Sequence, residues 1–428
     1  MFRRTQRKLT PAELADYLYD RLLAYYPASI PDFARERLER ELEYMELTQM
    51  DEALLLCREL SRAAERNGHV LHVDGTSVGS LLVFLLMQGR INPLPAHYDC
   101  PSCGCYELAS GVTFGLDLPE KTCPHCGTLM RRDGFSIPAE TVWRQGGRKR
   151  LPLEYRCSDG FFPYGLQIVK EFYAERERAV VPQGAIRADD TQLLEPIGAV
   201  VLPEGHTPAD YPQFMAYLVD GTPCFAGDYY EMKRCGMQRV ILTVSNTASA
   251  LKSVQAYSGV FNEDISTESL IGITCRDMTN TTFVSSEERM ALQTPGPAYY
   301  DIACALTLPH NDYADHYERI PSLNALHLPE FKTCPLYCRE DVFDRMSASG
   351  FDRETAAEAA ESIGFGRTAH KPVILEHLGV PEDISAMAAH CFYLFPRGSG
   401  AQRLLSLMLL AAYMKEDPQK YFKTIAHI

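Results

Sequence analysis

The chain has 428 residues, 46% of them hydrophobic, and a mean hydropathy of −0.19, which is typical of a globular protein with two or three domains. Its formal net charge of −14 argues against indiscriminate nucleic-acid binding, because proteins that grip phosphate backbones present a basic surface. No apolar run is long enough to cross a bilayer, and no apolar stretch follows the basic start of the chain. We therefore expect a cytoplasmic location and no membrane contact.

The first part of the chain, residues 1–68, predicts helices. Thr10 and Glu13 enclose a proline in the pattern of a capping box, and apolar residues follow at helical spacing. A second helix is expected after Pro31, and a third is expected to end at Gly68, because glycine commonly terminates helices.

The hydrophobic period changes beyond this region. Residues 69–73 predict a strand and residues 80–88 an apolar helix, with a two-glycine turn between them. Buried strands are also expected at 197–202 and 239–244. This order of elements predicts an α/β core flanked by two helical regions.

Two C-x2-C pairs, Cys100 with Cys103 and Cys123 with Cys126, predict a zinc site. Each pair forms a tight turn, and four thiolates at this spacing can bind one Zn2+ ion tetrahedrally. Four protein ligands leave no open position, so we expect a structural metal rather than a catalytic one. Cys105 is close enough to be an alternative ligand. The other nine of the 14 cysteines are expected to be buried thiols in a reducing compartment.

Several longer motifs accompany these cysteines. They are Gly75-Thr-Ser-Val-Gly-Ser80, Ile91-Asn-Pro-Leu-Pro-Ala-His-Tyr98, Leu116-Asp-Leu-Pro-Glu-Lys121, Asp133-Gly-Phe-Ser-Ile-Pro-Ala-Glu140, Glu195-Pro-Ile-Gly-Ala-Val-Val-Leu-Pro203, Tyr337-Cys-Arg-Glu-Asp341, Phe395-Pro-Arg397 and Asp417-Pro-Gln-Lys-Tyr-Phe422. In this order they resemble the polymerase core of bacterial DNA polymerase III alpha subunits of the PolC type. The resemblance is most specific between residues 75 and 140 and looser but collinear afterwards. No segment resembles the exonuclease, the phosphoesterase-like domain or the C-terminal duplex-binding and clamp-binding regions of that family.

The resemblance implies a polymerase-beta-like nucleotidyltransferase palm with a zinc-ribbon insertion and flanking helical regions. It divides the chain into an N-terminal helical region (1–68), a first part of the palm (69–96), the zinc ribbon (97–135), the rest of the palm (136–260), a thumb-like or linking region (261–338) and a helical, fingers-like region (339–428).

Polymerases of this family hold two Mg2+ ions with three palm aspartates, because cations that bridge a triphosphate and a primer hydroxyl need anionic oxygen ligands. The motifs align two of these aspartates with Pro152 and Glu154, and the third with a position near Ile241. Glu154 is then the only acid retained at a ligand position. Acids nearby in sequence that could compensate are Asp159, Asp228 and Glu231, although a solvent-facing carboxylate is the simpler interpretation of each. Losing ligands on two strands predicts a pseudoenzyme. Mg2+ would be needed only if the protein were an active enzyme.

The candidate nucleotide-binding residues are few. Gly75, Ser77, Gly79 and Ser80 form a turn before a helix, where free N–H groups could bind phosphate. The turn contains no lysine or arginine, and Gly75 replaces an arginine of the family, so a plain strand-to-helix turn is the favoured interpretation. On the fingers-like region, the resemblance retains Arg397.

A basic run offers the candidate nucleic-acid contacts, which are Arg144, Arg148, Lys149 and Arg150. Such runs are more often solvated loops, but this one follows the zinc ribbon closely and is the best candidate in the chain.

The family's folding motifs are retained while its metal ligands are replaced. This combination predicts a catalytically inactive PolC-like protein that acts as a replication-related nucleic-acid- or protein-binding module. Its partner would be DNA or a replication protein. Two alternatives stay open at this point. One is an active DNA-directed DNA polymerase that uses relocated carboxylates, and the other is an interaction-only scaffold without nucleic-acid contact. The sequence leaves open the oligomeric state and whether the gene is chromosomal, phage-borne or plasmid-borne.

Overall fold

In the computed structural model the chain divides into two compact units, each made of several stretches of sequence. Unit 1 consists of Met1–Glu52, Gly75–Leu151 and Val260–Lys423, and unit 2 of Ala53–Asp74, Pro152–Gly259 and Thr424–Ile428. The structure describes residues 9–144, 150–187, 190–227, 229–260, 262, 265–293, 296–315, 318–320, 329–371 and 373–428.

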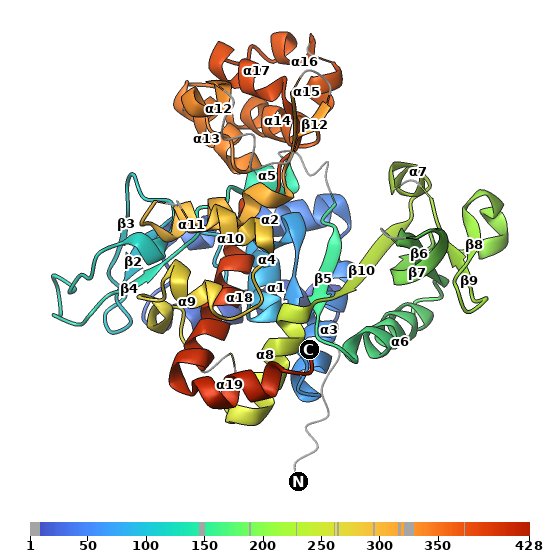
Figure 1. Cartoon of the computed structure of the whole chain (residues 1–428), viewed down its shortest axis with the longest axis horizontal. Helices are drawn as coiled ribbons and strands as arrows, with labels where there is room; N and C mark the ends of the chain where they lie inside the picture. Colours follow the sequence, from blue (N-terminus) through green and yellow to red (C-terminus); the bar gives the residue numbers. More distant parts are fainter. Residues whose placement is uncertain are drawn as a thin grey trace. The chain divides into compact units, whose positions relative to one another are not determined.

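Unit 2 contains a seven-stranded sheet in the order β1-β5-β10-β7-β6-β9-β8, most of which is green in Figure 1. Strands β5 and β10 are parallel, as are β6 and β9, and the other neighbours are antiparallel. The strands are β1 (Leu71–Val73), β5 (Leu153–Cys157), β6 (Val180–Arg187), β7 (Asp190–Val201), β8 (Met215–Tyr217), β9 (Pro223–Phe225) and β10 (Gln238–Val244).

Strand β5 has one face in the core of unit 2 and one face turned outward. Leu153, Tyr155 and Cys157 are buried, whereas Glu154 and Arg156 between them are partly or fully exposed. This period of two is the pattern of a strand covered on one side. The outward face therefore presents the polar residues of the strand.

The helices of unit 2 connect these strands. Helix α8 (Asn246–Ser258) begins at Ser245, whose hydroxyl accepts the N–H of Ala248, and ends at Gly259, which has a left-handed φ of 72°. The other helical elements are α3 (Asp51–Arg66), which begins in unit 1, α6 (Phe161–Ala174), α7 (Tyr229–Arg234), and the 3-10 turns η3 (Pro208–Asp210) and η4 (Pro212–Phe214).

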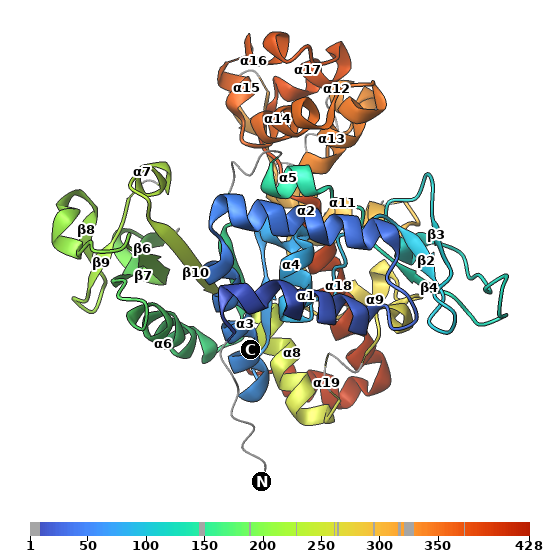
Figure 2. The ribbon, with the colours of Figure 1, turned by 180° about the vertical axis from the view of Figure 1, so that it is seen from behind.

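Unit 1 begins with helices whose first cap follows the sequence prediction. The N–H of Thr10 donates to the carboxylate of Glu13 at 3.0 Å, within the expected capping box. Helices α1 (Pro11–Tyr25) and α2 (Asp32–Thr48) both pack against α4 (Leu81–Met87), as Figure 2 shows.

A buried carboxylate fixes the start of α4. Glu41 accepts hydrogen bonds from the hydroxyl of Ser80 at 2.7 Å and from the N–H of Leu81 at 3.0 Å. Arg37 pairs with the same carboxylate at 2.6 Å. The turn η1 (Gly75–Gly79) ends directly before Ser80, so Glu41 connects this turn, α2 and α4 through bonds to a buried charge.

The cysteine pairs belong to a small antiparallel sheet in unit 1, with the strand order β3-β2-β4. We call this segment the ribbon. Its elements are β2 (His97–Asp99), β3 (Tyr106–Leu108), the 3-10 turn η2 (Gly115–Asp117) and β4 (Arg131–Asp133), and α5 (Ala139–Trp143) follows it.

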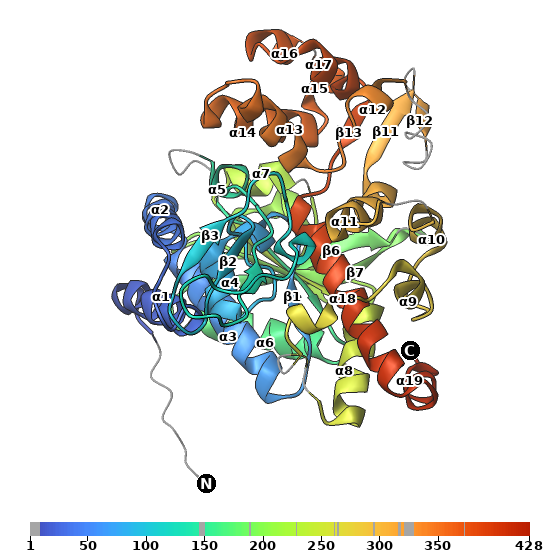
Figure 3. The same ribbon diagram turned by 90° about the vertical axis from the view of Figure 1, so that its left-hand side faces the viewer.

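Helix α18 (Arg397–Glu416) is the longest helix in the described part of the chain and is buried along most of its length. It is the long red helix in Figure 3. Helix α11 (Tyr299–Thr307) packs along it. Gly400 makes this contact possible, because a Cβ there would lie 2.8 Å from the carbonyl oxygen of Ala303. The other helical elements on either side of α11 and α18 in the chain are η6 (Glu268–Leu270), α9 (Cys275–Thr279), α10 (Ser286–Ala291), η7 (Leu308–His310) and α19 (Pro418–Ile425).

A group of shorter helices, orange to red in Figure 1, has a hydrophobic core of its own within unit 1. Residues of this core include Val342, Phe343, Ile363, Met387 and Leu394. The helices are α12 (Pro329–Thr333), α13 (Arg339–Ala348), α14 (Arg353–Gly364), α15 (Arg367–His370), α16 (Val373–His377) and α17 (Glu382–Ala388). The sheet β12-β11-β13 consists of β11 (Asp312–Asp315), β12 (Glu318–Ile320) and β13 (Cys391–Tyr393).

The expected α/β class is confirmed, and the strands expected at 69–73, 197–202 and 239–244 overlap β1, β7 and β10. The division into six functional ranges stays a prediction. Within the described ranges, no helix combines the length and the apolar character needed to cross a bilayer.

A buried ion pair in unit 1 gives a pH-dependent prediction. Glu288 is 2% exposed, and its carboxylate bonds to Arg403 at 2.7 Å. Burial raises the pKa of Glu288, but the hydrogen bonds from Arg403 and His310 outweigh it and lower the pKa to about 2 from an ordinary 4.5. The pair therefore stabilises the fold above pH 4.5, and this contribution is lost as the pH falls from 4.5 toward 2.

We expect Glu288→Gln to lower the free energy of unfolding by about 3 kcal/mol at pH 7, measured by urea denaturation. The difference from the unmodified protein should shrink below about pH 4.5, where the carboxylate of the unfolded chain begins to protonate. The matched control is Glu287→Gln, because its neighbour Glu287 is exposed; a change within about 0.5 kcal/mol is expected there. An equal loss of stability for Glu288→Gln at pH 7 and pH 3 would contradict this account.

Candidate functional site

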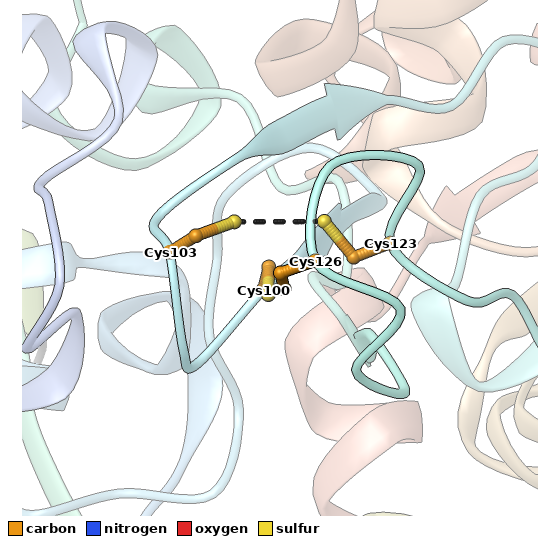
Figure 4. Close-up of side chains that lie close together, drawn as sticks. All are labelled: Cys100, Cys103, Cys123 and Cys126. Carbon is orange, nitrogen blue, oxygen red and sulfur yellow. Dashed lines mark hydrogen bonds between the residues drawn. The ribbon is translucent and has the colours of Figure 1, made fainter.

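Four cysteine side chains of the ribbon converge on one point. The sulfur of Cys100 lies 3.4 Å from that of Cys126, and the sulfur of Cys103 lies 3.5 Å from that of Cys123. All four sulfurs lie within 4.8 Å of one another, and Figure 4 shows how the two turns bring them together. The structure thus gathers the four expected ligands into a group that could hold a metal ion.

The two turns that carry these sulfurs have the same backbone form. The N–H of Gly104 donates to the carbonyl of Cys100 at 3.0 Å, and the N–H of Gly127 donates to the carbonyl of Cys123 at 2.9 Å. Both glycines have a φ of 73°, which glycine adopts without the steric cost that a side chain brings. The sequence Cys-Pro-x-Cys-Gly therefore folds each pair locally.

Local hydrogen bonds make one of these thiols acidic. The hydroxyl and the N–H of Thr128, together with the sulfur of Cys100, lower the pKa of Cys126 to about 6 from an ordinary 9.0. Metals bind cysteine as the thiolate, so a sulfur that is deprotonated at neutral pH favours metal binding at this point.

Cys105 does not belong to this group of four. Its carbonyl accepts the N–H of Cys100 at 2.8 Å. Its side chain is half-buried and packs against the small core that contains Cys100 and Cys123. Its role as an alternative ligand of the four-cysteine group stays a prediction.

A second group of potential metal ligands lies at the base of the ribbon. His97, Asp99 and Asp133 are buried, and one ligand atom from each lies within 4.8 Å of the others. Arg131 bonds to Asp99 at 2.8 Å, and the hydroxyl of Tyr25 donates to Asp133 at 2.7 Å. Because a guanidinium already serves as the cation of this group, we assign it a structural role that connects the ribbon to α1.

The sheet of unit 2 places side by side two of the three positions that the resemblance aligns with Mg2+ ligands. Glu154 of β5 lies directly opposite Ile241 of β10 in the parallel ladder. Pro152 lies two residues before Glu154 and directly precedes β5. Glu154 is the one carboxylate among these three positions.

Sequence reasoning missed Arg156, which lies on the same face two residues after Glu154. In the ladder Arg156 is opposite His72 of β1 and Thr243 of β10. Its guanidinium bonds to the carboxylate of Asp74 at 2.6 Å. The signal that could have found it was the strand period of two, counted from Glu154.

The acids considered as replacements have other neighbours. Asp159 follows the carboxyl end of β5, away from Pro152, and its carboxylate lies 3.3 Å from the amine of Lys252. Glu231 belongs to α7 and pairs with Arg234 at 3.7 Å. Asp228 lies outside the described residues.

The candidate phosphate turn, made of Gly75, Ser77, Gly79 and Ser80, is the turn η1 with the first residue after it. Ser77 and Gly79 are buried. A Cβ at Gly79 would lie 2.5 Å from the side chain of a neighbouring isoleucine, so this glycine serves close packing. The hydroxyl of Ser80 donates to Glu41, and a carboxylate of the protein itself therefore lies at the start of α4.

Arg397, which the resemblance predicts as a nucleotide-binding residue, is 3% exposed. Its guanidinium bonds to Asp344 at 2.6 Å, to Asp341 at 3.2 Å and to the carbonyl of Ser136 at 2.6 Å. It also lies over the ring of Tyr300. The charge of Arg397 is thus balanced inside unit 1.

The described residues of the basic run also bond within the protein. Arg144 pairs with Glu361 at 2.6 Å. Arg150 donates to the backbone carbonyls of Thr48 at 3.1 Å and Gln49 at 3.0 Å. The other two candidates, Arg148 and Lys149, lie outside the described residues.

These observations define a mixed α/β protein with a four-cysteine group that could hold a metal ion. No protein-family model matches the chain. Over part of its length it is similar to curated proteins named DNA polymerase III PolC-type. It is 33% identical to that of Bacillus subtilis (strain 168) over 166 residues, which are 38% of this chain and 12% of the relative.

Two further relatives with the same name give similar values. The protein of Caldanaerobacter subterraneus subsp. tengcongensis is 34% identical over 154 residues, which are 35% of this chain and 11% of the relative. That of Thermotoga maritima is 31% identical over 152 residues, again 35% of this chain and 11% of the relative. The expected partial resemblance to PolC-type DNA polymerase III is confirmed, and the chain spans about a tenth of the length of these relatives.

The four-cysteine group gives a metal-binding prediction. We expect Cys126→Ser to weaken Zn2+ binding by more than about tenfold, because it removes one of four thiolates. The measurement is a competition titration with a chromogenic chelator, together with the midpoint of thermal unfolding before and after zinc removal.

The matched control is Cys105→Ser, which changes a neighbouring thiol outside the group of four. This variant should keep the zinc affinity of the unmodified protein. If Cys105→Ser weakened the binding and Cys126→Ser did not, Cys105 would be the fourth ligand.

Proposed function

We propose that this protein is a catalytically inactive relative of the PolC-type polymerase core that acts in DNA replication as a binding module. The observation that carries the proposal is the face of the unit 2 sheet where Glu154 lies opposite Ile241. A two-metal phosphoryl transfer needs several carboxylates around its ions, and one glutamate cannot hold both metals.

We take the unit 2 sheet as the polymerase-beta-like palm that the resemblance implies. Its adjacent parallel strands β5 and β10 place Glu154 directly opposite Ile241, with Pro152 just before β5, which supports this assignment. Arg156 adds a positive charge to that face, and a fixed positive charge opposes the binding of divalent cations nearby. Its ion pair with Asp74 engages a second acid at this edge of the sheet.

The contacts of the candidate nucleotide-binding residues support the same conclusion. A triphosphate that approached Arg397 would have to displace Asp341 and Asp344 from a guanidinium that is 3% exposed. At the start of α4, a phosphate would meet the carboxylate of Glu41, which already accepts the hydroxyl of Ser80. The negative charges of a phosphate and of the Glu41 carboxylate would repel each other strongly at contact distance.

Of the two partner classes, the contacts favour a replication protein over DNA. Arg144 pairs with Glu361, and Arg150 donates to backbone carbonyls, so both cations already bond within the protein. The net charge of −14 also opposes phosphate binding. Binding of DNA through Arg148 and Lys149 is the alternative.

We further propose that the four cysteines hold one structural Zn2+ ion. Four thiolates complete its tetrahedral coordination, and the bound metal supplies a cross-link that stabilises the fold. The ribbon in turn supports the N-terminal helices, because the hydroxyl of Tyr106 donates to Asp32 at the start of α2 at 3.1 Å. Mg2+ would be required only by the active alternative.

Primer extension tests the proposed inactivity. We expect no extension of a primed template with Mg2+ or Mn2+ and all four deoxynucleotides, because the ligand positions carry one carboxylate. Product on denaturing gels should not exceed that of Glu154→Ala, and the PolC-type polymerase of Bacillus subtilis provides the positive control. Extension that Glu154→Ala abolishes would mean that relocated acids perform the chemistry.

DNA binding separates the two partner classes. We expect the dissociation constant for primed DNA at about 150 mM salt to be weaker than about 1 μM, in the range of non-specific binding. The measurement is fluorescence anisotropy at about 50, 150 and 200 mM salt. A submicromolar constant that weakens steeply with salt would instead favour a module that holds DNA.

A further inference from the structure

Strand β8 is the last strand of the unit 2 sheet, and within the described part of that sheet it pairs on one side only, with β9. Both strands are light green in Figure 1. The N–H of Leu218, the residue after β8, donates to the carbonyl of Thr222 on the β9 side at 2.9 Å. Backbone groups alternate in direction along an edge strand, so those of Met215 and Tyr217 face away from β9. An edge of this kind can accept a further strand.

The side chains of this segment divide between a buried and an exposed face. Phe214 and Leu218 are 3% and 8% exposed. The exposed face is apolar and consists of Met215, Tyr217 and Val219, which are 39%, 66% and 60% exposed. Proteins often place lysine or proline on an open edge to prevent pairing with another chain, and none of these three positions carries either residue. We call these three residues and the backbone of β8 the β8 edge.

The open backbone of the β8 edge is short. The N–H of Val219 donates to the carbonyl of Leu194 at 3.1 Å, so this donor is already used. Within the described ranges, the groups open to a new strand are therefore those of Met215 and Tyr217. Two residues offer few hydrogen bonds, so a partner strand would also need side-chain contacts with the apolar face. This requirement favours a segment with an apolar residue at every second position.

The charge around the β8 edge indicates a basic partner. Residues 203–232 contain five acids and no lysine or arginine. Asp210 precedes β8, Asp220 follows it, and both are exposed. Nucleic acid or a second copy of this chain would bring further negative charge to these carboxylates, whereas lysine or arginine would be attracted to them. The β8 edge therefore fits a protein segment that is both apolar and basic.

We propose that the β8 edge binds an extended segment of a partner protein in which apolar residues alternate with lysine or arginine. The segment adds an antiparallel strand beside β8, because antiparallel pairing forms the slightly more stable ladder. Its apolar side chains then lie beside Met215 and Tyr217, and its cations lie near Asp210 and Asp220. The inference names a surface for the protein partner of the proposed function and rests on that function.

The test measures how the 428-residue chain binds a fluorescein-labelled synthetic peptide of about nine residues in which lysine alternates with valine. We expect a dissociation constant of about 10–100 μM by fluorescence anisotropy at about 50 mM salt, because the interface is small. In an added antiparallel strand the valine amides face β8 and the lysine amides face away. N-methylation of the valines should therefore abolish binding, and N-methylation of the lysines should leave it intact.

A protein variant tests the same surface without any change to the peptide. Tyr217→Lys removes an apolar contact and adds a positive charge where a basic peptide binds, so the dissociation constant should rise at least about fivefold. The matched control is Tyr257→Lys, because Tyr257 of α8 is also an exposed tyrosine of unit 2. This control should bind the peptide like the unmodified protein, and thermal unfolding checks that both variants are folded.

Binding that survives N-methylation of the valines, or that Tyr217→Lys leaves unchanged, would overturn the proposal, as would no binding at about 1 mM peptide. A dimer in analytical ultracentrifugation that Tyr217→Lys dissociates would also overturn it and would assign the β8 edge to a second copy. Primer extension tests the proposed function separately. Extension together with peptide binding would contradict the inactivity and not the surface, whereas the absence of both would contradict the surface and not the inactivity.

Discussion

A buried charge needs an opposite charge or hydrogen-bond donors beside it, and this constraint organises unit 1. Glu140 of α5 is 3% exposed and bonds to Arg353 of α14 at 2.7 Å, across 213 residues of sequence. Arg397 of α18 bonds to Asp341 and Asp344 of α13 in the same way. Removing the partners of the buried member, Glu140 or Arg397, would leave its charge uncompensated in the interior, so each contact fixes the elements on both sides.

The same constraint explains how a motif can persist after its chemistry has gone. Glu140 ends the motif that begins at Asp133, and Arg397 ends the motif that begins at Phe395. Both side chains are committed to contacts inside unit 1. If the palm is inactive as proposed, these residues still stabilise the fold. Their presence is then explained by their packing contacts and not by a role in nucleotide transfer.

Local patterns in the sequence predicted the parts of the structure that depend on local geometry. The capping box at Thr10 and each of the two C-x2-C turns follow from spacing over a few residues, and the α/β class follows from the hydrophobic period and order of successive segments. The ion pairs of Arg156 with Asp74 and of Arg397 with Asp344 could not be predicted, because their partners lie 82 and 53 residues away. Such contacts depend on how distant elements pack, and no pattern within one element encodes them.

The interleaving of the two units has a consequence for synthesis on the ribosome. The chain passes between them five times, and the last long stretch of unit 1 extends to Lys423. Neither unit can be complete before its last stretch has been synthesised, so some native contacts of each unit must wait for residues that come much later in the chain. Folding of this kind depends on contacts between distant residues, which form slowly and leave apolar surface exposed to chaperones meanwhile.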